Sequence, residues 1–84
     1  MSAFDHSILH TILAQIDSNL SQGILPVHNG HITKLDDTDV LNCLLLMKQK
    51  GLISGDLVTR GTEKTPYRMT NIRLTYLGLR FLKS

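Results

Sequence analysis

Four histidines and one cysteine are the residues of this sequence that could bind a metal ion. His6 and His10 have the spacing that places two side chains on one face of a helix, and His28 and His31 flank an Asn-Gly pair. Structural zinc sites use paired motifs such as CxxC or HExxH, and neither motif accompanies these histidines or Cys43. We therefore interpret the histidines as surface residues and expect neither a metal nor another cofactor.

The sequence lacks the patterns that are typical of a catalytic site. No Ser/His/Asp or Cys/His grouping has the spacing of a known motif, and the glycines do not form a phosphate-binding loop. Cys43 stands beside a run of leucines, so we interpret it as a small apolar side chain. We expect that the protein is not an enzyme.

The apolar and cysteine content bears on where the protein acts. The longest apolar run covers residues 44–47, far short of the about 20 residues that span a membrane. No basic segment precedes a long apolar stretch, so we expect no secretory signal and no membrane partner. A single cysteine cannot form an internal disulfide, and a reducing cytoplasm is the expected location.

The charged residues are divided between the two halves of the chain. Residues 1–42 contain five acidic residues and one lysine, a net charge of −4, whereas residues 43–84 contain eight basic and two acidic residues, a net charge of +6. The basic half is compatible with a nucleic-acid-binding face. It is equally compatible with an acidic partner protein or with an ordinary solvated surface.

Apolar periodicity predicts the first of the elements that must position these residues. Apolar side chains recur with the i, i+3, i+4 and i+7 spacing of an amphipathic helix between residues 4 and 20. Ser2 or Asp5 is a candidate cap for its start, and the glycine at position 23 provides its end.

The segment after this helix is not expected to form a second helix of ordinary length. Pro26 excludes a helix interior, and the pair Asn29-Gly30 favours a tight two-residue turn. We expect either a very short hairpin in which Val27 lies opposite Ile32, or a loop with one strand.

A helix followed by a hairpin and a final helix is expected in the rest of the chain. Asp36 suits the N-cap of a helix with an inward stripe, and Gly51 suits its end; the stripe consists of Val40, Leu44 and Met47. Residues 52–61 and 65–74 are rich in β-branched and aromatic residues and predict two strands. Thr75 is the expected cap of the last helix, in which Gly78 permits a close approach.

This order of elements resembles a winged helix-turn-helix domain. The stretch LLLMKQKGLISG is similar to the end of the third helix in bacterial regulators of the ArsR and MarR kinds, and IRLTYLGLRFL resembles their exit from strand to helix. With ILHTILAQID at the front, the chain is similar to the small YjcQ-like proteins of prophages. The resemblance implies one α+β winged-helix domain over residues 1–84, with the second helix of the motif replaced by a loop or short hairpin.

The resemblance also implies that one face of the helix over residues 36–50 lies in the DNA major groove. That face is Leu41, Asn42, Cys43, Leu45, Leu46 and Gln49. Asn42 and Gln49 have amides that suit adenine, but leucines contact little on base edges, and the acidic residues at positions 36, 37 and 39 repel phosphates. We therefore expect Leu41, Leu45 and Leu46 to form an interface, most simply with a second copy of the chain.

Basic residues on or beside the expected hairpin are the alternative contacts to DNA. They are Arg60, Lys64, Arg68 and Arg73. Wings commonly follow the minor groove or the phosphates, so these side chains are candidates for backbone contacts. The competing interpretation is that they are solvated strand charges.

Two hypotheses follow from the sequence. The first is a small dimeric regulator of phage or mobile-element type that binds double-stranded DNA mainly through its wing. The second is a winged-helix module that binds a host or phage protein through the leucine-rich helix or the basic hairpin and does not recognise DNA. The acidic helix start and the missing second helix favour the second hypothesis, and the resemblance favours the first.

Overall fold

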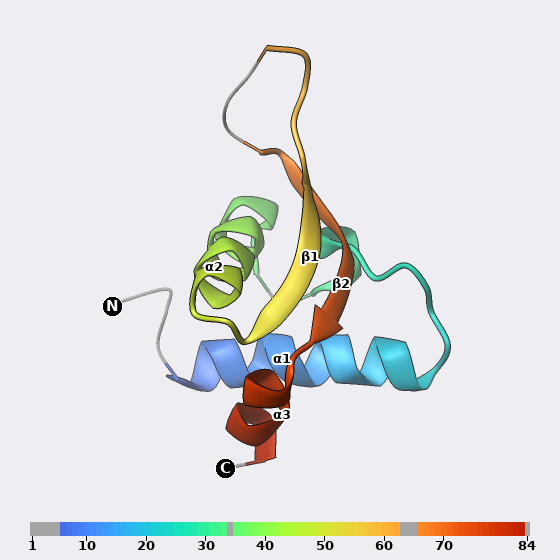
Figure 1. Ribbon diagram of the computed structural model, residues 1–84, viewed down its shortest axis with the longest axis vertical. Coiled ribbons are helices and arrows are strands. Elements are labelled where there is room, and N and C mark those ends of the chain that lie inside the picture. The colour runs from blue at the N-terminus through green and yellow to red at the C-terminus, as the bar shows by residue number, and fades with distance from the viewer. Residues whose placement is uncertain (1–5, 34, 63–65, 84) are drawn as a thin grey trace.

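A computed structural model describes residues 6–33, 35–62 and 66–83 of the protein (Figure 1). Lys34 and Lys64 therefore lie outside the described residues, as do Ser2 and Asp5, the two candidate caps of the first helix. In chain order, the elements are α1 (His6–Ser21), the 3-10 turn η1 (Asn29–His31), α2 (Asp37–Gln49), β1 (Ile53–Val58), β2 (Arg68–Leu74) and α3 (Tyr76–Lys83).

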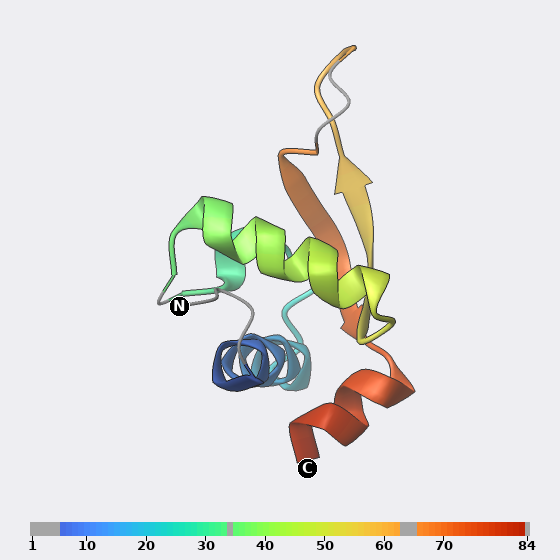
Figure 2. The same ribbon diagram turned by 90° about the vertical axis from the view of Figure 1, so that its left-hand side faces the viewer.

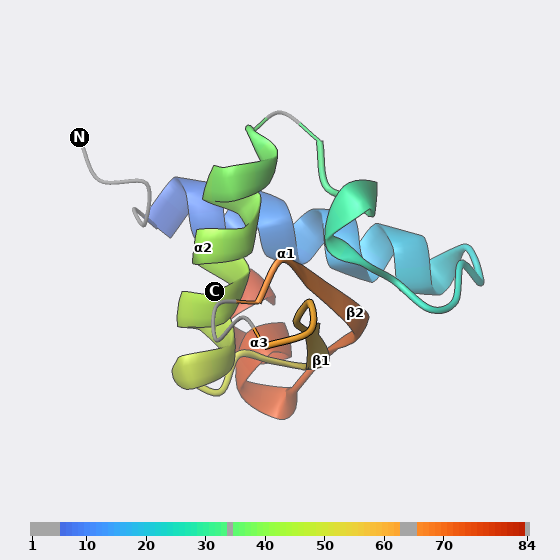
Figure 3. The same ribbon diagram turned by 90° about the horizontal axis from the view of Figure 1, so that it is seen from above.

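Three helices and a two-stranded antiparallel sheet form an α+β fold with a winged-helix-like arrangement, as the sequence predicted. Helix α2 crosses over α1, and the two strands extend beyond both helices as a wing (Figures 1 and 3). Figure 2 shows α1 nearly end-on beneath α2, with α3 below the wing base and beside α1. The core between these layers consists of Leu9, Ile12, Leu13, Ile16, Val27, Ile32, Val40, Cys43, Leu44, Met47, Leu52, Ile53, Met69 and Ile72.

Helix α1 has the buried stripe and the glycine end that its periodicity predicted. Its fully buried side chains lie three to four residues apart, namely Leu9, Ile12, Leu13 and Ile16. After Ser21 the backbone turns through Gly23, which has a φ of 78°, a conformation that glycine adopts without steric cost. The Ile24 N–H then donates to the Asn19 carbonyl at 3.0 Å, which satisfies an otherwise unpaired helix-end carbonyl.

The expected hairpin around Asn29-Gly30 is not formed. The segment is a loop, as in the other alternative, but residues 22–33 contain no strand. Residues 29–31 instead make the 3-10 turn η1, and neither Asn29 nor Gly30 has the positive φ that a two-residue hairpin turn requires. Val27 does not pair with Ile32, because its carbonyl accepts the N–H of Ile72 on β2 at 2.9 Å. A long-range backbone pairing thus replaces the local one.

Helix α2 begins and ends where the sequence predicted. Asp36 occupies the N-cap position, although its side chain makes no capping hydrogen bond. At the other end, Gly51 has a φ of 80°, and the Leu52 N–H donates to the Met47 carbonyl at 2.9 Å. The buried stripe consists of Val40, Cys43, Leu44 and Met47.

Cys43 corrects the predicted outward face of α2. The sequence placed this residue with Leu41 and Asn42 on the face available to a ligand, but its side chain is fully buried. The reason is helical geometry, because Cys43 is three residues after Val40 and four before Met47, both of which face the core. Burial, with a smaller contribution from Asp39, raises the pKa of the Cys43 thiol.

The wing is an irregular ladder rather than a flat hairpin. Ser54 lies opposite Arg73 and Asp56 opposite Thr70, so β2 has one extra residue between these pairs. Asn71 takes up the difference with a φ of 55°, a left-handed conformation that asparagine tolerates better than most residues. The bulge bends the strand that carries two of the candidate DNA-binding arginines.

Helix α3 is attached to the wing base by the cap and the close approach that the sequence predicted. The Gly78 N–H donates to the Thr75 hydroxyl at 3.1 Å, and that hydroxyl donates to the Gly51 carbonyl. Gly78 is buried, and a Cβ at this position would overlap the carbonyl oxygen of Leu52. The glycine is therefore required by close packing.

Candidate nucleic-acid interface

An exposed arginine lies over an aromatic ring where the wing extends beyond its two strands. The guanidinium of Arg60 lies over the Tyr67 ring, with its central carbon 4.4 Å from the ring centroid. Such a contact at an exposed site is worth about 0.5–1 kcal/mol, so it limits the motion of a long side chain without removing its charge. Arg68 follows Tyr67 and is also exposed. Lys64, the fourth predicted wing residue, lies outside the described residues.

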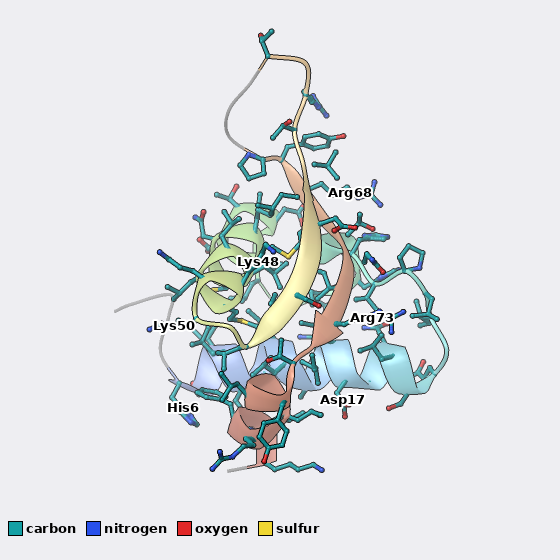
Figure 4. All side chains as sticks on the ribbon, in the orientation of Figure 1. His6, Asp17, Lys48, Lys50, Arg68 and Arg73 are labelled. Carbon is teal, nitrogen blue, oxygen red and sulfur yellow. The ribbon has the colours of Figure 1, made fainter. Side chains whose placement is uncertain are left out.

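The predicted wing arginines form a row and not a cluster. Arg68 and Arg73 lie at opposite ends of β2, separated by roughly 16 Å at about 3.3 Å per residue. Both are exposed, whereas Met69 and Ile72 between them are buried. Figure 4 shows the two arginines on the side of the sheet that faces away from α2. Among the described residues, no carboxylate pairs with Arg60, Arg68 or Arg73.

A second basic region lies on the other side of the molecule. Lys48 and Lys50 are exposed at the C-terminal end of α2, where Figure 4 shows them on the opposite side from Arg68 and Arg73. The basic half of the sequence is therefore not one continuous face.

A shallow hollow adjoins Arg68 and has the chemistry for an anionic group. It has a volume of about 270 Å³ and is lined by His28, Asn29, Gly30, Tyr67 and Arg68. The guanidinium presents a planar set of N–H donors, and the phenol of Tyr67 is a further donor. Guanidinium groups bind phosphate through paired hydrogen bonds, so the hollow suits a phosphate of a nucleic-acid backbone.

The predicted base-reading residues are exposed but stand apart from the arginines. Asn42 and Gln49 lie two helical turns apart on the outward face of α2. The helix start beside Asn42 is acidic, with Asp36 and Asp37 exposed and Asp39 half-buried. These carboxylates stabilise the helix through its dipole by about 0.3–1 kcal/mol each, but they repel phosphates.

The three leucines predicted to form an interface are less exposed than the sequence suggested. Leu41, Leu45 and Leu46 are each half-buried, and Leu41 and Leu45 pack against the core. The sequence placed them on a face that the monomer does not need, and the structure corrects this premise for Leu41 and Leu45, which pack against the monomer's own core. Leu41, for example, lines a groove together with Pro66 and Tyr67 of the wing.

That groove separates the start of α2 from the wing. It has a volume of about 370 Å³ and is lined by Asn29, Asp37, Thr38, Leu41, Asn42, Pro66 and Tyr67. Its apolar walls come from both elements, and its polar groups include one carboxylate. An apolar side chain of another protein with a basic neighbour fits this chemistry better than a phosphate does.

Sequence reasoning missed the most exposed apolar side chains of the last helix. Tyr76 is 73% exposed and Leu77 is 52% exposed, and Leu79 is the third exposed apolar residue of α3. The available signal was the width of the apolar arc, because Leu77, Leu79 and Leu82 cannot all face one neighbour at 100° per residue.

The four histidines and Cys43, all of which lie in the described ranges, do not assemble into a metal site. His10 shares a hydrogen bond of 2.7 Å with the Leu82 carbonyl, and the His6 ring lies 4.6 Å from the Phe81 ring. Within the described ranges, no group of three or more potential metal ligands lies together. In the same part of the chain, no helix has the length and apolarity needed to cross a membrane.

No protein-family model, curated protein sequence or solved structure matches this chain. The winged-helix-like arrangement therefore rests on the structure itself.

Proposed function

We propose that the protein is a small dimeric winged-helix protein that binds double-stranded DNA through backbone contacts of its wing. The observation that carries this proposal is the row of exposed arginines on the wing, none of which pairs with a carboxylate of the described residues. The resemblance of the sequence to phage-type winged-helix regulators supports a role in transcription regulation. A reducing cytoplasm, expected from the lone cysteine, is the proposed location.

The proposed contacts favour affinity over sequence preference. Arg68 contacts a phosphate at the hollow beside His28, and Arg60, held over Tyr67, contacts the backbone nearer the tip. Phosphate contacts position a protein on DNA but carry no direct sequence information. The acidic start of α2 keeps that helix out of the major groove.

Salt dependence and two single substitutions test this proposal. Fluorescence anisotropy with a duplex of random sequence should give a log–log salt slope of about −3 to −4 if all four predicted wing residues contact phosphates, at roughly −0.9 per contact. Arg68→Ala should flatten the slope by about one unit and weaken binding to all sequences alike. Lys48→Ala removes the same charge on the opposite side and should leave the slope unchanged.

Absence of measurable binding at low salt would contradict the proposal. An equal loss in Arg68→Ala and Lys48→Ala would assign the affinity to net charge and not to the wing. A strong sequence preference that survives Arg68→Ala would assign recognition to α2.

The groove between α2 and the wing favours a second candidate function, a protein-interaction module that does not bind DNA. The observation is that Leu41, Pro66 and Tyr67 form apolar walls beside the Asp37 carboxylate. A basic peptide with an apolar anchor suits these walls. Under this alternative, Leu41→Asp abolishes capture of the partner while Arg68→Ala leaves it unchanged.

A further inference from the structure

The turn η1 is closed by two histidine rings, each of which accepts a hydrogen bond from a backbone N–H of the turn. The His28 N–H donates to Nδ1 of His31 at 3.1 Å, and the Gly30 N–H donates to Nδ1 of His28 at 3.0 Å. The two ring centroids lie 3.9 Å apart. Side chains at positions i and i+3 eclipse in a 3-10 turn, which explains the stacking. The local fold of residues 28–31 thus depends on two imidazole nitrogens as hydrogen-bond acceptors.

These hydrogen bonds exist only when the rings are neutral. An imidazole nitrogen accepts a hydrogen bond only in its unprotonated form, so each ring carries its single proton on Nε2. Protonation places a hydrogen on Nδ1 as well, and two N–H donors then face each other. One proton on either ring therefore breaks one of the two hydrogen bonds.

The surroundings of His28 oppose its protonation. Burial, then the charge of His31 and then that of Arg68 on β2 lower the pKa of His28. Helix α1 presents the neutral amide of Gln15 to the neighbouring Thr33, and its Asp17 points away at the foot of the molecule in Figure 4. On α2, Asp37 lines the same groove as Asn29 of the turn. Its carboxylate is not among the causes of the lowered pKa of His28.

The turn also attaches the connector, the segment between α1 and α2 that contains η1, to the wing. The Asn29 side-chain oxygen accepts the Met69 N–H at 3.1 Å, and the Val27 carbonyl accepts the Ile72 N–H at 2.9 Å. Gly30 lies so close under the ring of His28 that an added Cβ would be 2.8 Å from the ring carbon Cε1. Loss of the turn therefore loosens the only described segment outside β1 whose backbone pairs with β2.

We propose that the His28–His31 turn is a pH-sensitive device that holds the connector on β2 when both rings are neutral and releases it when either ring is protonated. The proposal does not rest on DNA binding. In this role the two rings act as hydrogen-bond acceptors that hold the turn, and not as metal ligands or as solvated surface side chains.

The direction of the pH dependence follows from the lowered pKa of His28. The unfolded chain has a histidine pKa of about 6.5, above that of the folded turn. The stabilisation is therefore complete above about pH 6.5 and is lost as the pH falls from there through the folded pKa.

Nuclear magnetic resonance on the intact chain tests the proposal directly. At pH 7.5, long-range ¹H–¹⁵N spectra should show both His28 and His31 as the Nε2–H form. Between pH 7.5 and pH 5, the hydrogen-exchange protection factors of the Gly30 and Met69 amides should fall by about fivefold or more, the factor that loss of one backbone hydrogen bond gives.

A double substitution supplies the matched variant. In His28→Asn/His31→Asn, the asparagine oxygens accept the same two backbone hydrogen bonds but do not titrate, as at other caps. Protection of Gly30 and Met69 should then be independent of pH over the same range. His6→Gln removes an exposed histidine elsewhere and should keep the wild-type loss.

Two results would overturn the proposal. One is an Nδ1–H form of either ring at pH 7.5, and the other is the same pH-dependent loss in the double variant as in the wild type. If the double variant does not fold, the tautomers and the protection factors of the wild type decide alone. Because no DNA is present, a failure here is separate from a failure of the proposed function.

Discussion

At the scale of single residues, the side chains best suited to bases and those best suited to phosphates are on different elements. Asn42 is an exposed amide on α2 with acidic neighbours, whereas Arg68 is an exposed guanidinium on β2 without a carboxylate partner among the described residues. Recognition through α2 would bring Asp37 towards the backbone. Recognition through the wing places the DNA backbone against Arg68 and Arg73, on the side of the sheet that faces away from α2 (Figure 4).

Substitutions at the start of α2 distinguish these arrangements. Asn42→Ala should leave the affinity for DNA nearly unchanged, because the wing and not the helix makes the contacts. A loss of about 1–3 kcal/mol on one preferred site, with little loss on other DNA, would instead show that the amide reads a base. Asp37→Asn with Asp39→Asn should also leave the affinity unchanged, and tighter binding would show that phosphates pass near this end. Anisotropy titrations measure both.

Cys43 gives a prediction on reactivity. Its thiol is fully buried, and burial raises its pKa, so the reactive thiolate is scarcer at a given pH than in the unfolded chain. Labelling by a thiol reagent at pH 8 should therefore be slow in the native protein and become fast in denaturant. Equal rates in the two states would contradict the burial of this side chain.

At the scale of elements, the close approach of α3 to the wing base determines how the C-terminal helix is attached. Gly78→Ala places a methyl group against the Leu52 carbonyl, which is backbone and cannot rotate away. The substitution should lower the free energy of unfolding by about 1–3 kcal/mol or more, the usual cost of overpacking, as measured by urea denaturation. Arg80→Ala on the exposed side of α3 is the control and should change it by less than about 0.5 kcal/mol.

The elements that local signals specify were predictable from the sequence. The apolar stripe of α1, the glycine at the end of α2 and the threonine cap of α3 each act within a few residues. The connector was not predictable in the same way. Its Asn29-Gly30 pair favours a hairpin locally, but the pairing of Val27 with Ile72 and the capping by His28 and His31 are stronger in the folded chain.

The candidate site was predictable only in part, for a similar reason. Exposure of Arg60 follows from its place in the turn between the strands. Exposure of both Arg68 and Arg73, five residues apart on β2, depends on the bulge, because strict alternation would turn one of them to the buried face. The half-burial of Leu41 depends on Pro66 and Tyr67, which approach it from the wing. Neither periodicity nor composition shows that Leu41 lies near Pro66 and Tyr67, so the groove between them appears only in the three-dimensional structure.

At the scale of the whole molecule, the exposed basic and apolar side chains are spread over several sides and do not form one face. The arginines of β2 lie on one side, and the exposed lysines of α2 lie on the other (Figure 4). Exposed apolar side chains are found on α3, and a half-buried leucine, Leu46, lies on α2 outside the set that packs against the core. A chain of this size buries only about 60–65% of its unfolded surface, so association would add to its stability.

The oligomeric state is the prediction at this scale. We expect a homodimer that contacts through Leu46, with α1 and α3 as further contributors, because two-fold dimers are the commonest small assemblies. Size-exclusion chromatography with light scattering should give about twice the chain mass of 9.4 kDa. Leu46→Asp should shift the protein towards the monomer, because it places a charge in an apolar contact.

Two further substitutions locate the contact. Leu77→Asp should also weaken the dimer if α3 contributes to it, whereas Leu25→Asp, at an exposed apolar residue of the connector, should not. A wild-type monomer at high micromolar concentration would rule out the homodimer. A dimer that resists Leu46→Asp but dissociates with Leu77→Asp would move the interface from α2 to α3, and it would leave the outward face of α2 available to a different partner.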